Sequence, residues 1–444
     1  MKFLNLFLPK SVNDFYLIII FVGAFVARLL FLINVQTELV SDFLNYHMLA
    51  SNIAAGLGHT MHELPVAWQG MGYPFVLGFF YYLTGTTSIM AGGMLNIIFS
   101  MGTLFFCYFI YIKIFDTKKY ALIALALTAF LPQYIAYVNV IGTEVFFTFI
   151  LSAIIFTKLY FLKRLSGYIA ISVLIGLASL IRPFMMAYPL IIGVFVYSTT
   201  KAFKKSVVLS VFCMAIVFII ISPWTIRNYM HFERLILVSY NSGYVLYINN
   251  NDVNTRGVWM DPLNATIHTP YRHDILLHAL EERTIHQVHE IEPYFNTWAR
   301  QWILQNPIEY LKLGILRVNN TFFTGANDIP QWAANMSPLN DIYLTGLERN
   351  WHYRNHNFIE ASLSIATLIL TGAGFLFMFA MLKTYTIGLF THKLQLSLHT
   401  AVIFINFAFF IVIPFFFEGQ ARYAFPAFIF IIPAAVRLIE HIKN

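Results

Sequence analysis

Long apolar runs separated by short polar stretches dominate the chain. Ten of these runs approach the roughly 20 residues that an α-helix needs to cross the hydrocarbon core of a bilayer. We expect spans at 14–35, 88–112, 119–138, 142–162, 166–181, 183–199, 206–225, 357–382, 395–416 and 423–440. The fifth and sixth runs are short and meet at Arg182-Pro183, which fits one kinked hairpin as well as two spans. The pattern predicts an all-α polytopic membrane protein with about 10 transmembrane helices.

Two longer polar segments interrupt the runs and divide the chain into regions. The first, at 36–87, follows the first apolar run and is expected to be a long outer loop. The second, at 226–356, has mixed charges and helical periodicity, which predicts a small, mainly helical extracytoplasmic domain. We therefore expect an N-terminal transmembrane region at 1–225 and C-terminal transmembrane helices at 357–444.

Composition supports this class and excludes others. The 444 residues are 59% hydrophobic and only 11% charged, against roughly 25% charged residues in an ordinary soluble domain. The mean hydropathy is +0.68, which excludes a soluble globular protein and a disordered chain. The net charge of +7 comes from residues scattered between apolar runs. Without a dense basic patch, the expected partner is the lipid bilayer and no nucleic acid.

Lysine and arginine follow different distributions, and this predicts the orientation. With the N- and C-termini in the cytoplasm, one side of the membrane carries a net charge of +12 and the other −5. Twelve of the 13 basic residues away from the cytoplasmic side are arginines. Arginine is preferred where a planar fork grips phosphate or carboxylate. We expect a multi-pass protein of the cell membrane (inner or plasma membrane) whose outer side holds an anionic ligand, although pairing with the outer acids also fits.

Two acids lie at predicted outer ends of spans. Asp42 follows the first span, and Glu144 begins the fourth in Thr143-Glu144. Acids at the edge of a bilayer are costly and are usually functional. Together they are candidates for a general base and for ligands of a divalent metal ion. Each is also compatible with a structural role, because an acid in the first turn of a helix is favoured by capping and by the helix dipole.

Three arginines mark outer span ends and are candidates for binding a phosphate. Arg182 precedes a proline, Arg227 ends the segment Pro223-Trp224-Thr225-Ile226-Arg227, and Arg422 lies before the last span. A guanidinium at this depth can hold a lipid phosphate through two parallel hydrogen bonds. Snorkelling to the interface is the alternative for any one of them.

Other candidate residues lie in the first outer loop. His59, His62 and Glu63 are close to Asp42 in sequence and are possible metal or substrate contacts. The chain has no P-loop, GxSxG or HExxH motif. We therefore expect no nucleotide cofactor, and the energy for any reaction must arrive in a lipid-linked donor.

These features together resemble the polytopic glycosyltransferases of the GT-C superfamily. The nearest match is the bacterial branch related to protein O-mannosyltransferases and lipid A aminoarabinose transferases, similar to glycosyltransferase families 39 and 83. The resemblance runs over nearly the whole chain. Its motifs are Ser41-Asp42, Gly72-Tyr73-Pro74, Thr143-Glu144, Ile181-Arg182-Pro183, Pro223 to Tyr229, Asn241-Ser242-Gly243, Tyr247-Ile248-Asn249-Asn250, Asn306-Pro307 and Arg422-Tyr423 with Pro426.

The resemblance implies a polyprenyl-phosphate sugar donor, attack by a hydroxyl of a glycan, lipid or protein acceptor, and inversion at the anomeric carbon. Asp42 matches the acid of the first loop, which serves as base or metal ligand in this family. Many relatives carry two adjacent acids there, whereas this chain has Phe43 next. Tyr73 and Asn249 lie in matching motifs and are possible substrate contacts.

Two other functions fit parts of the pattern. A transporter or flippase of lipid-linked sugars would also need many spans and outer arginines, but it should show inverted repeats and polar residues at mid-membrane. No such repeat is evident in the sequence. An O-antigen-type polymerase or ligase would also place arginines in a large outer loop, but it does not need an acid after the first span.

The charge asymmetry generates a topology prediction. Single cysteines introduced at Asn264 and Lys393 should react with an impermeant thiol reagent from opposite sides of the membrane, with Asn264 outside. Labelling of both positions from the same side would contradict the predicted orientation.

Overall fold

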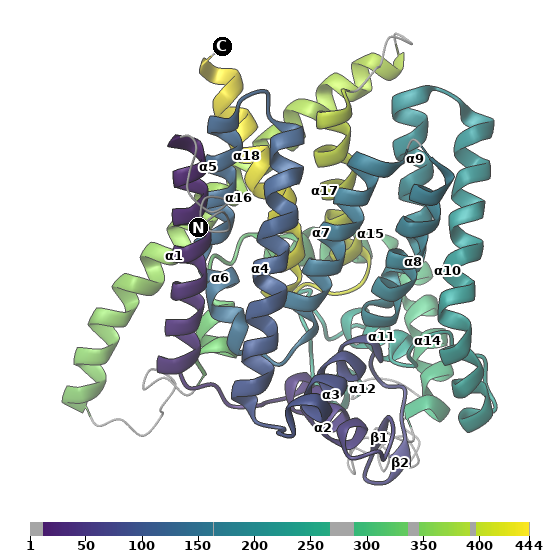
Figure 1. Cartoon of the computed structure of the whole chain (residues 1–444). Coiled ribbons are helices and arrows are strands. Elements are labelled where there is room, and N and C mark those ends of the chain that lie inside the picture. The colour runs from purple at the N-terminus through teal and green to yellow at the C-terminus, as the bar shows by residue number, and fades with distance from the viewer. Residues whose placement is uncertain (1–11, 163, 267–287, 336–345, 391–396, 444) are drawn as a thin grey trace.

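The computed structural model describes residues 12–162, 164–266, 288–335, 346–390 and 397–443. Figure 1 shows a bundle of long helices with shorter elements gathered at one end. The described part of the first outer loop and α11, α12 and α14 lie at this end, which we call the outer end. The start of α1 and the C-terminus lie at the opposite end.

In the described part of the chain, ten apolar helices or helix pairs build the bundle. Among these residues, eight helices are long and apolar enough to cross a membrane, and a ninth candidate is a pair bent by 55°. The bundle elements are α1 (Val12–Asn34), α4 (Ile89–Ile114), α5 (Lys118–Ala129) with α6 (Pro132–Ala136) and η2 (Tyr137–Asn139), α7 (Thr143–Phe161), α8 (Leu165–Ile181), η3 (Pro183–Ala187) with α9 (Tyr188–Thr200), α10 (Phe203–Phe232), α16 (Gly346–Phe390), α17 (Leu398–Phe416), and η6 (Ala421–Ala427) with α18 (Phe428–Lys443).

Every predicted span corresponds to one of these elements, and the chain is a multi-pass membrane protein. Two of them depart from a simple crossing helix. The run predicted at 119–138 bends before Pro132, because proline has no N–H to continue the helix and its ring clashes with the preceding turn. Helix α8 has only 17 residues and ends at Ile181, so that Arg182 lies between the helix and Pro183.

A buried arginine stabilises the bend before Pro132. Arg28 is fully buried in α1 and donates from Nη1 to the carbonyl oxygen of Ala129 at 2.9 Å. Its Nε donates to Ser100 Oγ at 2.7 Å. Because water cannot satisfy carbonyls freed inside a bilayer, a side-chain donor at the break replaces the missing helical hydrogen bond.

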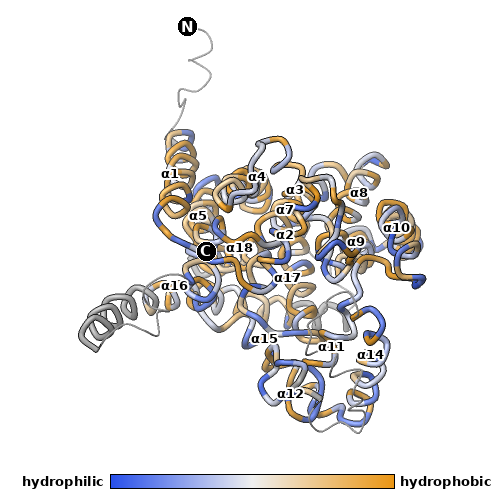
Figure 2. Tube along the Cα trace, turned by 90° about the horizontal axis from the view of Figure 1, so that it is seen from below, coloured by the Kyte–Doolittle hydropathy of each residue, from blue (hydrophilic) through white to orange (hydrophobic). Residues whose placement is uncertain are grey.

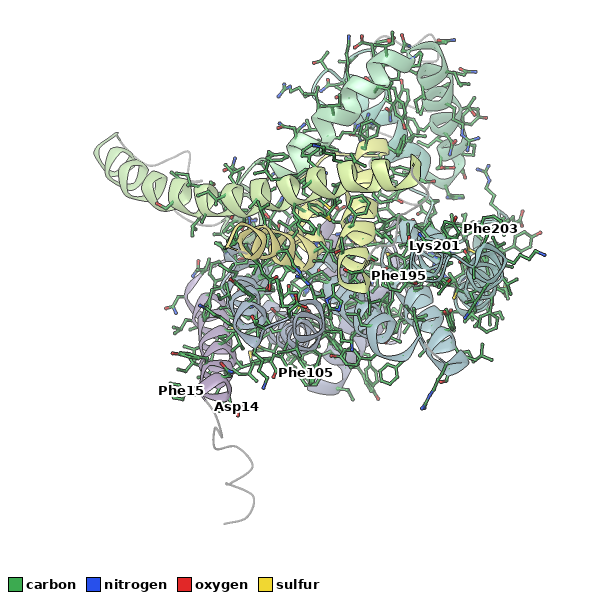
Figure 3. All side chains as sticks on the ribbon, turned by 90° about the horizontal axis from the view of Figure 1, so that it is seen from above. Asp14, Phe15, Phe105, Phe195, Lys201 and Phe203 are labelled. Carbon is green, nitrogen blue, oxygen red and sulfur yellow. The ribbon has the colours of Figure 1, made fainter. Side chains whose placement is uncertain are left out.

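The perimeter of the bundle is apolar, as expected for contact with lipid. Phe15, Phe105 and Phe203 lie at the rim in Figure 3 and are about half exposed or more. In Figure 2, α1 and α10 are mostly hydrophobic along their length, whereas hydrophilic segments gather around α12 and α14 at the outer end.

The first outer loop forms a compact unit against the bundle. Helices α2 (Asp42–Ala54) and α3 (Gly72–Thr84) pack on each other and flank a two-stranded hairpin, β1 (Thr60–Met61) and β2 (Leu64–Pro65). The contact between the helices requires glycine at position 78, since a Cβ there would lie 2.8 Å from the carbonyl oxygen of Ala50. This packing fixes the start of α2, where Asp42 lies.

The predicted outer domain contains α11 (Ser242–Asn249), α12 (Pro262–Thr266), α14 (Val288–Gln305), α15 (Pro307–Phe322) and η4 (Ile329–Ala333). A separate apolar core, which includes Trp224, Tyr247 and Phe295, joins α11 and α14 to the end of α10. The predicted boundaries at 226 and 356 fall inside α10 and α16, and part of this region lies outside the described residues.

Arg317 connects the outer domain to the membrane helices. Its side chain is fully buried in α15, donates from Nη2 to the carbonyl oxygen of Asn249 at 2.6 Å, and donates from Nη1 to that of Phe415 at 3.2 Å. Burial lowers the pKa of Arg317 to about 10, which leaves the guanidinium charged. The outer domain is thereby fixed against the segment that leads from α17 to η6.

Lys158 is a charged residue inside the bundle, in the last turn of α7. It is 2% exposed, and its Nζ lies 3.1 Å from Tyr188 Oη and 3.0 Å from Asn406 Oδ1. The ring centroid of Phe195 lies 4.8 Å from Nζ. Polar and aromatic contacts therefore replace water around this ammonium group.

Candidate active site

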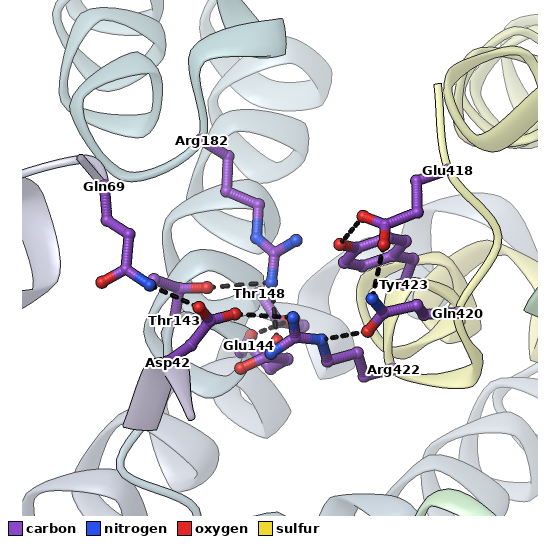
Figure 4. Close-up of polar contacts among 10 residues, drawn as sticks. All are labelled: Asp42, Gln69, Thr143, Glu144, Thr148, Arg182, Glu418, Gln420, Arg422 and Tyr423. Carbon is purple, nitrogen blue, oxygen red and sulfur yellow. Dashed lines mark hydrogen bonds and ion pairs between the residues drawn. The ribbon is translucent and has the colours of Figure 1, made fainter. Parts of the chain in front are cut away.

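The outer ends of three bundle elements and the start of α2 meet in one polar network. Asp42 comes from the first turn of α2 and Glu144 from the first turn of α7. Arg182 follows the last residue of α8, and Arg422 belongs to η6. Figure 4 shows these side chains converging, although up to 380 positions separate them in the sequence. Four of the predicted site residues are thus brought together.

Asp42 uses both carboxylate oxygens in this network. Its Oδ2 accepts from Arg422 Nη2 at 2.7 Å, and its Oδ1 accepts from Gln69 Nε2 at 2.7 Å. Neither oxygen caps α2, for which no side-chain capping hydrogen bond is found. The side chain keeps 30% of its surface exposed. A carboxylate held in this way is open to a reacting molecule.

Glu144 is almost completely buried and forms the second ion pair. Its Oε1 accepts from Arg182 Nη2 at 2.7 Å, and the same nitrogen donates to Thr143 Oγ1 at 2.8 Å. Glu144 is 1% exposed, and its Oε2 has no hydrogen-bond partner among the described residues. Arg182 reaches this position because α8 ends directly before Pro183.

Tyr423 contacts both arginines. Its ring centroid lies 5.5 Å from the guanidinium carbon of Arg182 and 5.5 Å from that of Arg422. Its hydroxyl donates to Glu418 Oε2 at 2.6 Å. An aromatic face is attracted to guanidinium groups, so this ring helps to hold two like charges in one site.

Glu418 anchors this part of the network. Its Oε1 accepts from Gln420 Nε2 at 2.7 Å, and Gln420 Oε1 accepts from Arg422 Nε at 2.7 Å. Burial raises the pKa of Glu418, which is 5% exposed. Glu418 and Gln420 therefore fix the Nε side of Arg422, while its Nη2 reaches Asp42.

Aromatic side chains form a further wall of the site. Phe43 and Trp332 lie 5.5 and 5.6 Å from the guanidinium carbon of Arg422, and their rings meet edge to face at 5.4 Å. The position at which many relatives are expected to carry a second acid thus holds a ring that packs on the arginine. Trp332 comes from η4, so the outer domain contributes to the site.

The sequence analysis did not assign roles to several residues of the network. Gln69, Glu418 and Tyr423 were missed because a glutamine, a glutamate and a tyrosine beside apolar runs carry no distinctive spacing. Asp328, in the segment before η4, is 2% exposed, and burial raises its pKa to about 6. Its electrostatic interaction with Glu144 places it near the network.

Arg227, unlike Arg182 and Arg422, contacts the first outer loop rather than the acids of this network. Its Nη1 donates to the carbonyl oxygen of Val66 at 3.0 Å, and its Nη2 donates to that of His59 at 3.1 Å. The Trp224 ring lies 4.6 Å from its guanidinium carbon. Arg227 therefore ties the end of α10 to the first outer loop, and its predicted role in phosphate binding stays a prediction.

The candidates of the first outer loop differ in burial. His59 is buried and donates from Nδ1 to the carbonyl oxygen of Val66 at 3.0 Å, and burial lowers its pKa to about 4. His62 and Glu63 are exposed and form the turn between β1 and β2, where both have positive φ. Within the described ranges, no group of three or more His, Cys, Asp or Glu side chains is placed to hold a metal ion.

The two remaining candidates are fully buried. The hydroxyl of Tyr73 donates to Asn96 Oδ1 at 3.4 Å, and its ring packs edge to face against Tyr46 at 5.9 Å. Asn249 donates from Nδ2 to the carbonyl oxygen of Val245 at 2.9 Å, and its Oδ1 has no partner among the described residues. Their contacts with a substrate stay a prediction.

The network does not fit a divalent metal site as it is arranged. Asp42 and Glu144, the acids expected to ligate a metal, are each paired with an arginine. A metal ion needs several ligand oxygens free to converge on it. In this arrangement the two guanidinium groups take the positions that a cation would fill.

Comparisons with known proteins agree with the resemblance. Residues 69–226, less than half of the chain, match the family described as dolichyl-phosphate-mannose-protein mannosyltransferase. No curated protein matches the chain. The structure of the Archaeoglobus fulgidus oligosaccharyltransferase in the apo form superposes with a TM-score of 0.52 at 14% identity, covering 98% of this chain and 52% of that one. A structure of the same archaeal enzyme with an inhibitory peptide and a dolichol-phosphate gives a TM-score of 0.49 at 13% identity, covering 97% and 50%.

These findings confirm the predicted resemblance to the GT-C superfamily and its all-α membrane fold. The chain spans about half the length of the solved oligosaccharyltransferase structures that it matches. Its resemblance to one bacterial branch of the superfamily rests on the motifs quoted above.

The buried pair of Glu144 and Arg182 generates a stability prediction. Glu144→Met and Arg182→Met should each lower the unfolding free energy by about 3–5 kcal/mol, because each leaves an unpaired buried charge. The double variant, which leaves no such charge, should lose less than the sum of the two. The unfolding of all four proteins in detergent measures this coupling, and strictly additive losses would contradict it.

Proposed function

We propose that this protein is a membrane glycosyltransferase that moves a sugar from a polyprenyl-phosphate donor to an acceptor hydroxyl on the outer side, with inversion. The observation that carries the proposal is the pairing of Asp42 with Arg422 at the outer end of the bundle. An acid and an arginine at this depth match the two needs of the reaction, a base for the hydroxyl and positive charge for the phosphate.

The family match supports this donor class. The description of the matched family names a dolichyl-phosphate sugar and a transferase acting on protein, and a dolichyl phosphate is a polyprenyl-type lipid phosphate. The fold shared with an oligosaccharyltransferase also fits glycosyl transfer. The sugar could be a hexose or a pentose, and the acceptor a glycan, a lipid or a protein, because the chemistry requires only a hydroxyl group.

The reaction needs no general acid. The acceptor oxygen attacks the anomeric carbon, its proton passes to the carboxylate of Asp42, and the bond from that carbon to the phosphate oxygen breaks. The electron pair stays on the polyprenyl phosphate, which is a weak base. Inversion follows because the acceptor and the departing phosphate lie on opposite faces of the sugar.

Arg422 and Arg182 are suited to hold the phosphate. Each keeps one terminal nitrogen, Nη1, without a hydrogen bond to any described residue. Negative charge on the phosphate grows as the sugar leaves, so fixed guanidinium groups stabilise the transition state more than the ground state. Their positive charge replaces that of a divalent cation at the phosphate. We therefore propose that transfer needs neither a metal ion nor a nucleotide cofactor.

The proposal also includes the orientation. The start of α1 and the C-terminus lie at the end opposite the network, which fits cytoplasmic termini in a cell-membrane protein with its site facing outward.

Substitution of Arg422 tests the phosphate assignment. Lysine keeps the charge but loses the bidentate fork, so Arg422→Lys should transfer more slowly than wild type and Arg422→Ala more slowly still. The transfer rate is measured against the concentration of polyprenyl-phosphate sugar at matched amounts of folded protein. Equal curves for arginine and lysine would leave only a snorkelling role for Arg422.

Substitution of Asp42 tests the base. Asp42→Asn keeps the shape of the side chain but loses its basicity, so transfer should fall by about 10²–10⁴-fold while the amount of folded protein is unchanged. Single-turnover rates with saturating donor isolate this step from binding. A rate near that of wild type would assign Asp42 a structural role.

A further inference from the structure

Asp42 and the donor phosphate are both anions that can bind the guanidinium group of Arg422. Asp42 Oδ2 lies 2.7 Å from Arg422 Nη2, while Gln420 Oε1 takes the Nε proton at 2.7 Å. Both edges by which a guanidinium can hold an anion bidentately, Nε with Nη2 and Nη1 with Nη2, include Nη2. A phosphate bound through two nitrogens therefore brings a second anion to the nitrogen that Asp42 uses.

Two anions on one nitrogen repel each other in a site with little water. Arg422 keeps 11% of its side chain exposed, so the repulsion is only weakly screened by solvent. Asp42 is the more exposed partner, with 30% of its side-chain surface accessible. The Nε side of Arg422 is held through Gln420 by the buried Glu418. The arginine thus has one fixed side and one side at which partners can exchange.

We infer that the lipid phosphate of the donor competes with Asp42 for Arg422, so that donor binding releases the carboxylate to act as the base. The inference rests on the proposed function and adds a binding order, with the donor before the productive acceptor. Until the donor arrives, Arg422 occupies Oδ2 of Asp42, so this oxygen is not free to accept the proton of an acceptor hydroxyl. The pair therefore prevents Asp42 from taking the proton of an acceptor hydroxyl while no sugar donor is bound.

Glu144 does not compete in this way. It is 1% exposed and its pairing with Arg182 is backed by Thr143, which accepts from the same nitrogen. The two ion pairs thus differ: the carboxylate of Glu144 is buried, whereas that of Asp42 is partly exposed and open to exchange.

Binding of a sugar-free polyprenyl phosphate tests the competition without any transfer step. The dissociation constant is measured for the purified full chain in detergent by titration calorimetry. Asp42→Asn, which removes the competing charge but keeps the side-chain shape, should bind the probe roughly tenfold more tightly than wild type. Glu38→Gln is the matched control, since it removes an exposed charge four positions earlier in the same loop, and its affinity should equal that of wild type. Thermal unfolding of each variant confirms that folded proteins are compared.

Two further variants separate this inference from the proposed function. Arg422→Ala should weaken binding, and adding Asp42→Asn to it should bring no gain, because the competition acts through Arg422. Equal affinities of wild type and Asp42→Asn, or a gain that persists without Arg422, would overturn the competition. Unchanged binding by Arg422→Ala would instead overturn the phosphate assignment on which it rests.

Discussion

The structure depends on the pairing of charges where water is scarce. Removing an ion from water costs several kcal/mol even after the protein relaxes, so a buried charge persists only with a close partner. Glu144 is 1% exposed and meets this requirement with Arg182 at 2.7 Å. The pair fixes the start of α7 against the end of α8, and the pair of Asp42 and Arg422 fixes the first outer loop against η6. Four elements from distant parts of the chain are thereby brought to one point.

Neutral and aromatic side chains determine how rigid each pair is. Gln69 donates a hydrogen bond to one oxygen of Asp42. Gln420 links Glu418 to Arg422, because it donates to the glutamate and accepts from the arginine. The ring of Tyr423 contacts both arginines and reduces their mutual repulsion. These contacts preorganise positive charge before any ligand arrives, which is the arrangement that favours a transition state with growing negative charge.

The residues of the site lie where helices are broken or end. A helix in a bilayer satisfies its own backbone, and the four side chains of the site lie where helices begin or end. Helix α8 ends at Ile181, so that Arg182 lies between it and Pro183, and Pro426 lies in the short helical segment that carries Arg422. The bend before Pro132 needs Arg28 to satisfy a free carbonyl. Prolines that would interrupt an ordinary membrane-spanning helix therefore lie beside the side-chain contacts that hold these elements together.

The sequence by itself determined the membrane class, each apolar element, and the residues Asp42, Glu144, Arg182 and Arg422 as candidates. These follow from hydropathy, from charge placement and from prolines, all of which are local properties of the chain. Only the tertiary structure decided that the four side chains form two ion pairs, that Gln69, Glu418 and Tyr423 support them, and that Arg227 donates to carbonyl oxygens of the first outer loop. The spacing of an acid or an arginine along one helix carries no information about a partner hundreds of residues away. That choice is made by packing, because a charge desolvated by the neighbouring helices must take whichever partner the fold brings within reach.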